Sequence, residues 1–175
     1  FDLEKWRGAA SKAGQFIRDS GIKQFAFQIK PFKGLSEEEL TESFVTGLLL
    51  GTYQFNEFKT LERGKIKTIE EAILLGETDK EIQSIGEGSR KGTIISDAVC
   101  TARNLVNGPS NQVTPMLLAE KARQIAKDHS MEIQVLEVSE AEARSPGNSS
   151  FWNIIKGRSW IPSLWWGKGS HSTVV

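Results

Sequence analysis

Apolar and polar residues alternate along this chain in segments of helical and strand-like spacing. Asp2 is placed to cap a first helix, and the helical pattern ends near Ser20-Gly21. The apolar face predicted for that helix comprises Trp6, Ala10, Ala13, Phe16 and Ile17. Residues 23–30 then alternate, with apolar residues at every second position, and this predicts a strand with at least one buried face. Residues 31–34 contain Pro31 and Gly34 and end the strand. The predicted inward side chains are Phe25, Phe27 and Ile29.

A capping box from Ser36 to Glu39 opens a second predicted helix. Two of its residues, Gly47 and Gly51, lie four positions apart on one side. Two interpretations stay open: the glycines allow a close approach to a sheet, or they only weaken the helix. The buried stripe of this helix is predicted to be Leu40, Phe44, Leu48 and Phe55.

Residues 69–75 predict a second strand, although Glu70-Glu71 interrupts the apolar run. Thr78 to Glu81 forms another capping box, from which a helical pattern runs to residue 106. At 1.5 Å per residue this helix would be about 40 Å long. Such a length in a small chain favours a connecting helix between two domains. Its predicted face comprises Ile82, Ile85, Ser89, Ile95, Val99, Ala102 and Val106.

Residues 102–115 separate this helix from the next. Asn107 and Gly108 tolerate the left-handed backbone that often closes a helix, and Pro109 cannot continue one. Thr114 is placed to cap the following helix, with Pro115 at its first position. We therefore expect a rigid elbow between two helices.

The helix after the elbow is predicted to end near residues 128–130, and the alternation over residues 132–138 predicts a further strand. The stripe of that helix is Leu118, Ala122, Ile125 and Ala126. The order helix, strand, helix, strand is typical of an α/β fold.

Composition narrows the class of protein. The chain has 175 residues, with 22 basic and 22 acidic side chains, and its lack of net charge weighs against nucleic acid or an anionic membrane as a partner. Its one cysteine, Cys100, excludes an intramolecular disulfide framework and fits a reducing compartment. No apolar run approaches the roughly 20 residues of a membrane-spanning helix.

Because the chain opens with Phe1 rather than Met, we expect a fragment.

Few side chains are candidates for chemistry. His129 and His171 are far apart and have no Cys or paired carboxylate at metal-ligand spacing. Cys100 follows Val99 on the long helix and is interpreted as a small buried hydrophobe rather than a nucleophile. The acidic runs at residues 37–39 and 70–71 are interpreted as solvated charges.

A glycine pattern in the long helix is one residue off a dinucleotide fingerprint. It comprises Gly86, Gly88 and Gly92, and it lies inside a helical pattern rather than directly after a strand. The fingerprint is therefore a weak signal for nucleotide binding.

The elbow carries a family resemblance. Residues 104–115 read Asn-Leu-Val-Asn-Gly-Pro-Ser-Asn-Gln-Val-Thr-Pro. They resemble the Leu-Val-Asn-x-Pro-x-Asn-x-x-Thr-Pro junction of the leucyl (cytosol) aminopeptidases, which are two-metal exopeptidases. The resemblance implies that residues 1–106 are the latter part of an N-terminal α/β, macrodomain-like domain, including a connecting helix over 78–106. It implies that residues 107–175 are the junction and an incomplete beginning of the catalytic domain.

The resemblance becomes thinner in the tail, residues 144–175. This tail holds four of the five tryptophans and no acidic residue. Residues 151–157 stand where the family has Phe-Leu-x-Val-x-x-Gly, but a Trp cluster replaces aliphatic residues further on.

By the same resemblance, the parent protein would release N-terminal amino acids from peptides with a free N-terminus, in the cytoplasm, as a homohexamer. It would use two divalent metals, Zn or Mn, held by a Lys, several Asp and a Glu. Those ligands follow a Gly-Lys-Gly-x-Thr-Phe-Asp segment in the family. Gly167-Lys168-Gly169 matches its first three letters, but Ser170-His171-Ser172 follows and supplies no carboxylate.

We accordingly assign no catalytic, cofactor-binding or metal-binding residue and expect the chain to be inactive alone, with no membrane partner. The alternative is a non-enzymatic α/β module that binds a nucleotide or a protein, because the family's N-terminal domain resembles macrodomains.

Overall fold

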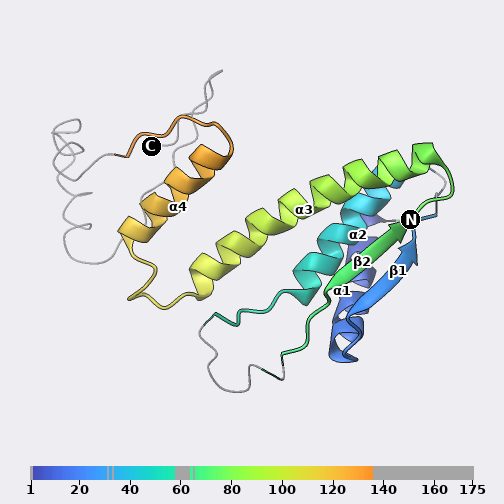
Figure 1. Cartoon of the computed structure of the whole chain (residues 1–175), viewed down its shortest axis with the longest axis horizontal. Helices are drawn as coiled ribbons and strands as arrows, with labels where there is room; N and C mark the ends of the chain where they lie inside the picture. Colours follow the sequence, from blue (N-terminus) through green and yellow to red (C-terminus); the bar gives the residue numbers. More distant parts are fainter. Residues whose placement is uncertain (1, 31, 33, 58–63, 65, 136–175) are drawn as a thin grey trace. The chain divides into compact units, whose positions relative to one another are not determined.

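The computed structural model describes residues 2–30, 32, 34–57, 64 and 66–135 of the chain (Figure 1). The chain divides after Asn107 into two compact units. The first contains α1 (Leu3–Asp19), β1 (Gln24–Gln28), α2 (Glu37–Thr52), β2 (Glu71–Leu75) and α3 (Asp79–Asn107). Within the described residues the second unit contains α4 (Pro115–Asp128). Helices and a small parallel sheet make the fold α/β, as predicted.

Helix α1 begins and ends where the sequence predicts. The Asp2 carboxylate accepts a hydrogen bond from the backbone N–H of Glu4 at 2.9 Å. At the other end Gly21 adopts a φ of 77°, which a glycine reaches without steric cost. The backbone N–H of Gly21 donates to the Arg18 carbonyl, and that of Ile22 donates to the Ile17 carbonyl, so the last turn closes as a Schellman motif.

The predicted apolar face of α1 is partly wrong. Phe16 is 72% exposed, and Ala13 is exposed as well. Ala10 is buried as predicted, and Gly14 is buried beside it, because the contact face is set by the close approach of α2. Trp6 contributes to the core as expected, and its indole N–H donates to the Leu40 carbonyl at 3.0 Å.

The two strands pair in parallel, with Phe25 opposite Ala72 and Phe27 opposite Leu74. Strand β2 begins at Glu71, two residues later than predicted, since Ile69 and Glu70 precede the ladder. Phe27 stacks on Phe44 of α2 with ring centroids 4.5 Å apart and an angle of 13° between the planes. The phenylalanine side of the sheet therefore packs on α2, as the alternation over residues 23–30 predicts. The core that forms there comprises Ala10, Ile29, Leu40, Phe44, Val45, Leu48 and Ile85.

Helix α2 opens with the predicted capping box, in which the Ser36 hydroxyl accepts from the Glu39 N–H and the Glu39 carboxylate accepts from the Ser36 N–H. Leu40, Phe44 and Leu48 are buried as predicted. Phe55 does not belong to this stripe, because the helix ends at Thr52.

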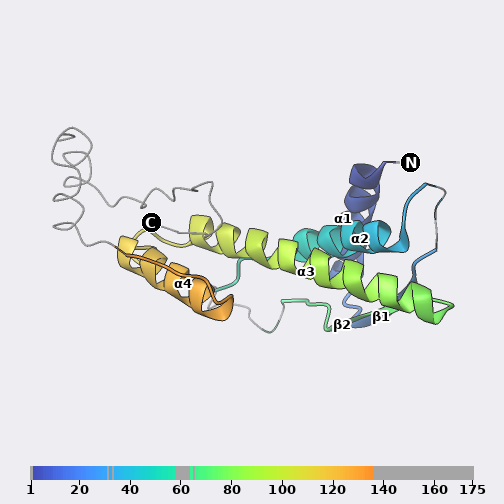
Figure 2. The same cartoon turned by 90° about the horizontal axis from the view of Figure 1, so that it is seen from above.

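Glycines hold α2 close to both neighbouring helices. A Cβ built on Gly51 lies 2.7 Å from the Ser11 Cα of α1, and one built on Gly47 meets the Arg7 carbonyl oxygen. The close approach proposed for these glycines is therefore correct, but the partner is helix α1 rather than the sheet. On the other side, a Cβ on Gly88 of α3 meets the Glu38 carbonyl oxygen of α2 and lies 2.8 Å from the Thr41 Cβ. Figure 2 shows α2 lying alongside α3.

Helix α3 has 29 residues, close to the predicted span of 78–106. The Thr78 hydroxyl accepts from the Glu81 N–H at 3.3 Å, as expected of a cap. The Glu81 carboxylate accepts from the N–H of Glu77 rather than that of Thr78, so the box is displaced by one residue.

The predicted face of α3 is only partly correct: Ile85 is buried and Ser89 and Val99 are half-buried. Ile82, Ile95 and Val106 are 55%, 41% and 84% exposed, and Ala102 is exposed too. Besides Ile85, the helix buries Gly88, Gly92 and Ser96, which the predicted face does not contain. The reason is that α2 approaches so closely that only small side chains fit between the two backbones.

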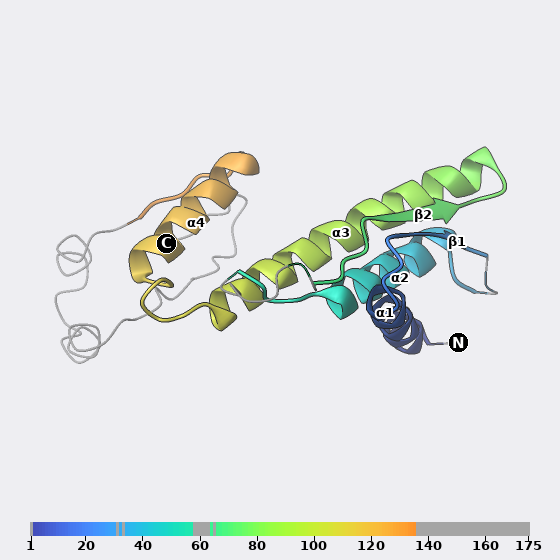
Figure 3. The ribbon, with the colours of Figure 1, turned by 60° about the horizontal axis from the view of Figure 1, so that its bottom comes forward.

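Helix α2 runs beside α3 (Figure 3), and polar contacts join its C-terminal end to the C-terminal end of α3. The Tyr53 hydroxyl donates to the Asn104 Oδ1 at 2.7 Å and accepts from the Asn107 Nδ2 at 3.3 Å. The Arg103 guanidinium lies 5.4 Å from the Tyr53 ring centroid and donates to the Leu50 carbonyl at 3.1 Å. Because Leu50 is in the last turn of α2, this arginine satisfies a carbonyl that the helix itself leaves unpaired.

The left-handed closure predicted at Asn107 or Gly108 is wrong, since neither residue has a positive φ. The segment instead turns where the backbone N–H groups of Gln112 and Val113 both donate to the Pro109 carbonyl. Thr114 caps α4 as predicted, its hydroxyl accepting from the Leu117 N–H at 3.2 Å, with Pro115 at the first helical position.

In α4 itself, Ala126 is buried and Leu118 and Ala122 are half-buried, whereas Ile125 is 44% exposed, contrary to prediction. No strand is assigned to residues 132–135, and the rest of the predicted strand at 132–138 lies outside the described residues.

Candidate functional site

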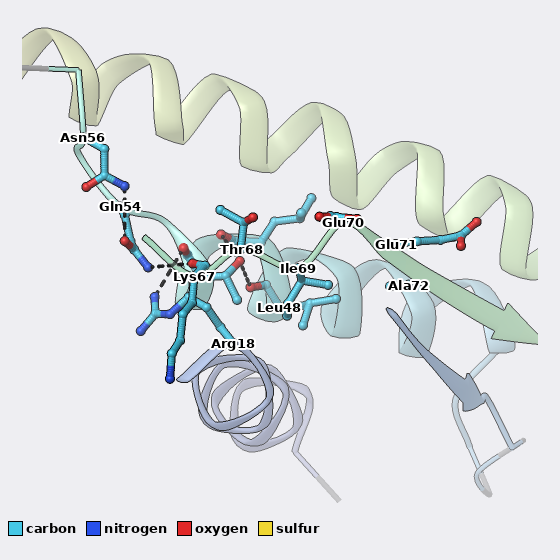
Figure 4. Close-up of a pocket in the computed structure, with 12 residues that line it drawn as sticks. Arg18, Leu48, Gln54, Asn56, Lys67, Thr68, Ile69, Glu70, Glu71 and Ala72 are labelled. Carbon is cyan, nitrogen blue, oxygen red and sulfur yellow. Dashed lines mark hydrogen bonds between the residues drawn. The ribbon is translucent and has the colours of Figure 1, made fainter. Parts of the chain in front are cut away.

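A pocket opens where the C-terminal ends of α1 and α2 meet the segment that leads into β2 (Figure 4). It has a volume of about 300 Å³. The Gln54 side-chain amide lies between Asn56 and Arg18, and its oxygen accepts from the Arg18 guanidinium, at 3.2 Å from Nη1 and 3.1 Å from Nε. The Asn56 Oδ1 is buried and, among the described residues, has no hydrogen-bond partner.

Two of the charged residues that line this pocket, Arg18 and Glu70, form ion pairs. The Arg18 guanidinium lies 2.9 Å from the Asp19 carboxylate and donates to the Thr52 carbonyl at 3.4 Å. Glu70 pairs with Lys23 at 2.6 Å. The hydrogen bond and charge of Glu70 raise the pKa of the exposed Lys23 above its ordinary value. The pocket lining thus offers no pairing of a nucleophile with a base, and its arginine caps a helix rather than awaiting a ligand.

The carboxyl ends of β1 and β2 form the sheet edge at which open α/β proteins usually bind ligands. Helices α2 and α3 both begin beyond this edge. At each helix start lies a carboxylate of the chain itself: Glu39 accepts from the Ser36 N–H and Glu81 accepts from the Glu77 N–H. The Ser36 N–H and hydroxyl hold the pKa of the Glu39 carboxyl below its usual range. Helix ends with bound carboxylates are poor sites for a phosphate.

The glycines of the weak dinucleotide pattern do not form a loop. Gly88 and Gly92 lie inside α3 and pack against α2, while Gly86 has open space beside it. The pattern therefore lies inside a helix, as its sequence context predicts, and two of its glycines serve helix packing.

The other candidates lie apart from each other. Burial raises the pKa of the half-buried Cys100 thiol, so the residue is not poised as a thiolate. His129 is exposed at the C-terminal end of α4. Lys168 and His171, with the rest of the Trp-rich tail, lie outside the described residues.

The part of the chain that the structure describes contains no group of three or more His, Cys, Asp or Glu side chains that could hold a metal ion. Over the same residues, no helix is both long and apolar enough to cross a membrane. The polar residues of the pocket were not singled out in the sequence, because Arg18, Asn56 and Lys67 belong to no motif and come together only through the fold.

Comparison with known proteins identifies the family. The profile of the "Cytosol aminopeptidase family, N-terminal domain" matches residues 1–62. A probable cytosol aminopeptidase of Geobacter sp. (strain M21) is 34% identical over 163 residues, which are 92% of this chain and 32% of that protein. One from Alkaliphilus oremlandii (strain OhILAs) is 33% identical over 132 residues, covering 75% of this chain and 26% of the relative. The chain thus spans between a quarter and a third of these curated relatives.

Solved structures share the fold. A tomato leucine aminopeptidase mutant superposes with a TM-score of 0.64 at 24% identity, over 79% of this chain and 28% of that one. A bottromycin maturation enzyme, BotP, in complex with Mn superposes with a TM-score of 0.59 at 21% identity, over 75% of this chain and 26% of that one. Together with the sequence matches, they show that this chain belongs to the leucyl (cytosol) aminopeptidase family and includes a region of its N-terminal domain.

Proposed function

We propose that this chain is part of a longer two-metal leucyl aminopeptidase that releases N-terminal amino acids from peptides, and that the chain is inactive by itself. Residues 1–106 would form the latter part of the N-terminal domain, with the helix over 78–106 as the connection. Residues 107–175 would form the junction and the beginning of the catalytic domain.

The observation that carries this proposal is the reach of the sequence match. The Geobacter relative aligns with 92% of this chain, yet the alignment takes up only 32% of that relative. A fragment spanning the end of one domain and the beginning of the next would align in this way. The division of the chain after Asn107, next to the family's junction motif, is in keeping with it.

Two divalent metals, Zn or Mn, would serve the parent enzyme by activating water and stabilising the tetrahedral intermediate. The described residues do not fit such a centre, because they hold no group of three potential ligands of the His, Cys, Asp or Glu type. We therefore place the metal ligands of the parent in another part of the protein. A hexameric assembly and a cytoplasmic location follow from family membership alone and are part of the same proposal.

The alternative function, a nucleotide-binding module, is disfavoured by the carboxylates that lie where α2 and α3 begin, beyond the sheet edge. The carboxylates of Glu39 and Glu81 lie at the helix starts, where their negative charge would repel a phosphate. A protein-binding role is favoured by a different feature, the exposed apolar side of α3.

The test is an assay of the purified chain for leucine-amide hydrolysis with added Mn²⁺ or Zn²⁺, beside the intact Geobacter relative as a positive control. We expect turnover by the relative only, and calorimetry should detect no stoichiometric metal binding by this chain. Metal-dependent turnover that persists after contaminating peptidases are removed would contradict the proposal. Reading the gene beyond the codon for Val175 tests whether the chain is part of a longer enzyme. We expect a carboxylate-rich segment after a Gly-Lys-Gly motif, and a stop codon would refute the longer enzyme.

A further inference from the structure

Asn107 and Gly108 stand where α3 ends, and together they form the only Asn-Gly pair in the sequence. Asparagine is one of the thermolabile residues of proteins, because the backbone nitrogen of the next residue can attack its side-chain amide carbon. A glycine in the next position leaves that approach open, since it has no Cβ. The other five asparagines of the chain precede Glu57, Leu105, Gln112, Ser149 and Ile154. The pair at the end of α3 therefore combines the reactive side chain with the least hindered nucleophile.

The position of Asn107 at a helix end favours this reaction. Ring closure requires the main chain of the asparagine to rotate out of the helical conformation. Asn107 is the last residue of α3 and is exposed, Pro109 cannot continue the helix, and helix ends fray. The Asn107 Nδ2 donates to the Tyr53 hydroxyl at 3.3 Å, which is longer than the usual range for such a hydrogen bond. The site therefore opposes the rotation only weakly.

Two nearby asparagines show what distinguishes this site. Asn104 is also exposed, but it lies inside α3, and its side-chain oxygen accepts from the Tyr53 hydroxyl at 2.7 Å. Asn111 is exposed in the turn that follows the helix. The residue after each of them carries a Cβ that hinders the attacking nitrogen. Exposure is thus common to all three asparagines, and the glycine together with the helix end is particular to Asn107.

We propose that Asn107 is a modification site, at which spontaneous deamidation through Gly108 converts the last residue of α3 to aspartate and isoaspartate. The Gly108 nitrogen forms a bond to the Asn107 Cγ, the bond from Cγ to Nδ2 breaks, and ammonia leaves with the proton of the Gly108 amide. Water then opens the succinimide: attack at Cγ gives aspartate, and attack at the main-chain carbonyl carbon gives isoaspartate. Water is the only co-reactant, and nothing is oxidised or reduced. This inference goes beyond the proposed aminopeptidase function and does not depend on it.

Either product loosens the contact between the C-terminal ends of α2 and α3. Deamidation removes the Nδ2 group that donates to the Tyr53 hydroxyl. That hydroxyl has a single proton, which can then serve either Asn104 or the new carboxylate but not both. The new carboxylate also lies at the negative end of the α3 dipole, where an anion is unfavourable. Isoaspartate additionally inserts a methylene group into the main chain at the residue where the first unit ends.

The first test is peptide mapping by mass spectrometry of the purified chain after incubation at neutral and at mildly alkaline pH. The tryptic peptide of residues 104–121 contains Asn104, Asn107 and Asn111, so fragmentation compares all three in one molecule. We expect the mass increase of an amino group replaced by a hydroxyl group at residue 107, and faster conversion at the higher pH. The masses at the other two asparagines should stay unchanged over the same period. A sample digested without incubation corrects for deamidation during the digest.

A pair of glycine variants isolates the role of Gly108. Gly108→Ala should slow the modification about tenfold or more, because the added Cβ hinders the attacking nitrogen. Alanine fits there without backbone strain, since the φ of Gly108 is not positive. Gly86→Ala is the matched control: it makes the same change in α3 at a glycine that follows Ile85 rather than an asparagine, and it should leave the rate unchanged.

The proposal is overturned by a residue 107 that stays unmodified, by equal rates at residues 107 and 111, or by a Gly108→Ala rate equal to that of the wild type. Slowing by Gly86→Ala as great as that by Gly108→Ala would place the reaction in the unfolded chain and would overturn the proposal too.

The second test addresses the consequence with Asn107→Asp, which reproduces the aspartate product. Protection of the amides of residues 104–107 against hydrogen exchange should fall roughly two- to fivefold, the usual size of an unfavourable charge at a helix end. Asn107→Gln is the control, since it stays neutral and keeps a side-chain amide. It should retain the wild-type protection and show no mass increase at residue 107, because glutamine would have to close a larger ring. Equal protection in the two variants would refute the loosening.

Discussion

Replacing Gly88 by alanine should destabilise the first unit, although alanine is the better helix former. In an exposed helix interior, glycine to alanine stabilises by about 1 kcal/mol. At Gly88 the added Cβ would meet the Glu38 carbonyl oxygen, a backbone atom that no rotamer change can remove, and would lie 2.8 Å from the Thr41 Cβ. Overpacking of this kind costs about 1–3 kcal/mol. Because the clash is with backbone, we expect the upper part of that range and a net loss of about 2 kcal/mol.

Gly86 provides a matched control in the same helix. A Cβ built there has no atom within 4 Å, so Gly86→Ala should stabilise by about 1 kcal/mol. Gly92→Ala should fall between the two variants, since its Cβ would lie 2.8 Å from the Glu42 carbonyl oxygen and 3.0 Å from the Val45 Cβ. The free energy of unfolding should therefore decrease in the order Gly86→Ala, wild type, Gly92→Ala, Gly88→Ala.

The assay is urea denaturation followed by circular dichroism at 222 nm, a wavelength that reports helix content. If Gly88→Ala is unfolded in buffer alone, the whole series is measured in trimethylamine N-oxide, which favours burial equally in each variant. Stabilisation by Gly88→Ala to the same extent as by Gly86→Ala would refute the reasoning. It would mean that the glycines of α3 do not set the distance to α2.

Further predictions concern three polar groups. Thr114→Ala should lower the helicity of α4 and cost about 1 kcal/mol, because the Leu117 N–H loses its acceptor; faster hydrogen exchange at Leu117 would report it, and unchanged exchange would argue against the cap. Tyr53→Phe keeps the ring under Arg103 but removes both hydroxyl hydrogen bonds, so a loss of about 1 kcal/mol in urea melts is expected, and no loss would mean the contacts are not formed in solution. The carboxyl of Glu39 has a pKa lowered by its hydrogen bonds to Ser36, so its stabilising effect is present above the unfolded-state value and lost as pH falls through the folded value. Glu39→Gln should flatten that part of the stability–pH curve in acid, and an unaltered curve would contradict the capping box.

Local signals in the sequence were reliable because they depend on near neighbours. The caps at Asp2, Ser36 and Thr114 involve residues two or three positions away, and the structure forms all three. The strand from Gln24 to Gln28 was also recognisable, since its alternation reflects one buried face.

The face of α3 was mispredicted because apolar periodicity assumes that large side chains mark the buried side. Here the buried side is marked by Gly88, Gly92 and Ser96, whose small size permits the approach of α2. The exposed Ile82 and Ile95 were therefore predicted to be core residues. Only the position of the neighbouring helix shows whether large or small side chains mark the buried side of a helix.

The family could be recognised from the sequence, whereas the pocket could not. The junction motif over residues 104–115 has fixed spacing that is readable without a fold. Arg18 and Asn56, by contrast, come from segments separated in sequence, and no local sequence pattern predicts that they line the same pocket.

Because β1 pairs with β2, β1 is synthesised well before its partner strand exists. Lys23 and Glu70, which form an ion pair where the ladder begins, are 47 positions apart. At about 5–20 residues per second, roughly 2–9 s separate the appearance of the two strands. Helices α1 and α2 can pack within that time, and Phe44 can then cover Phe27. The backbone edge of β1 stays open until β2 arrives, so the interval between them is the period in which a nascent chain is most exposed to pairing with a foreign strand.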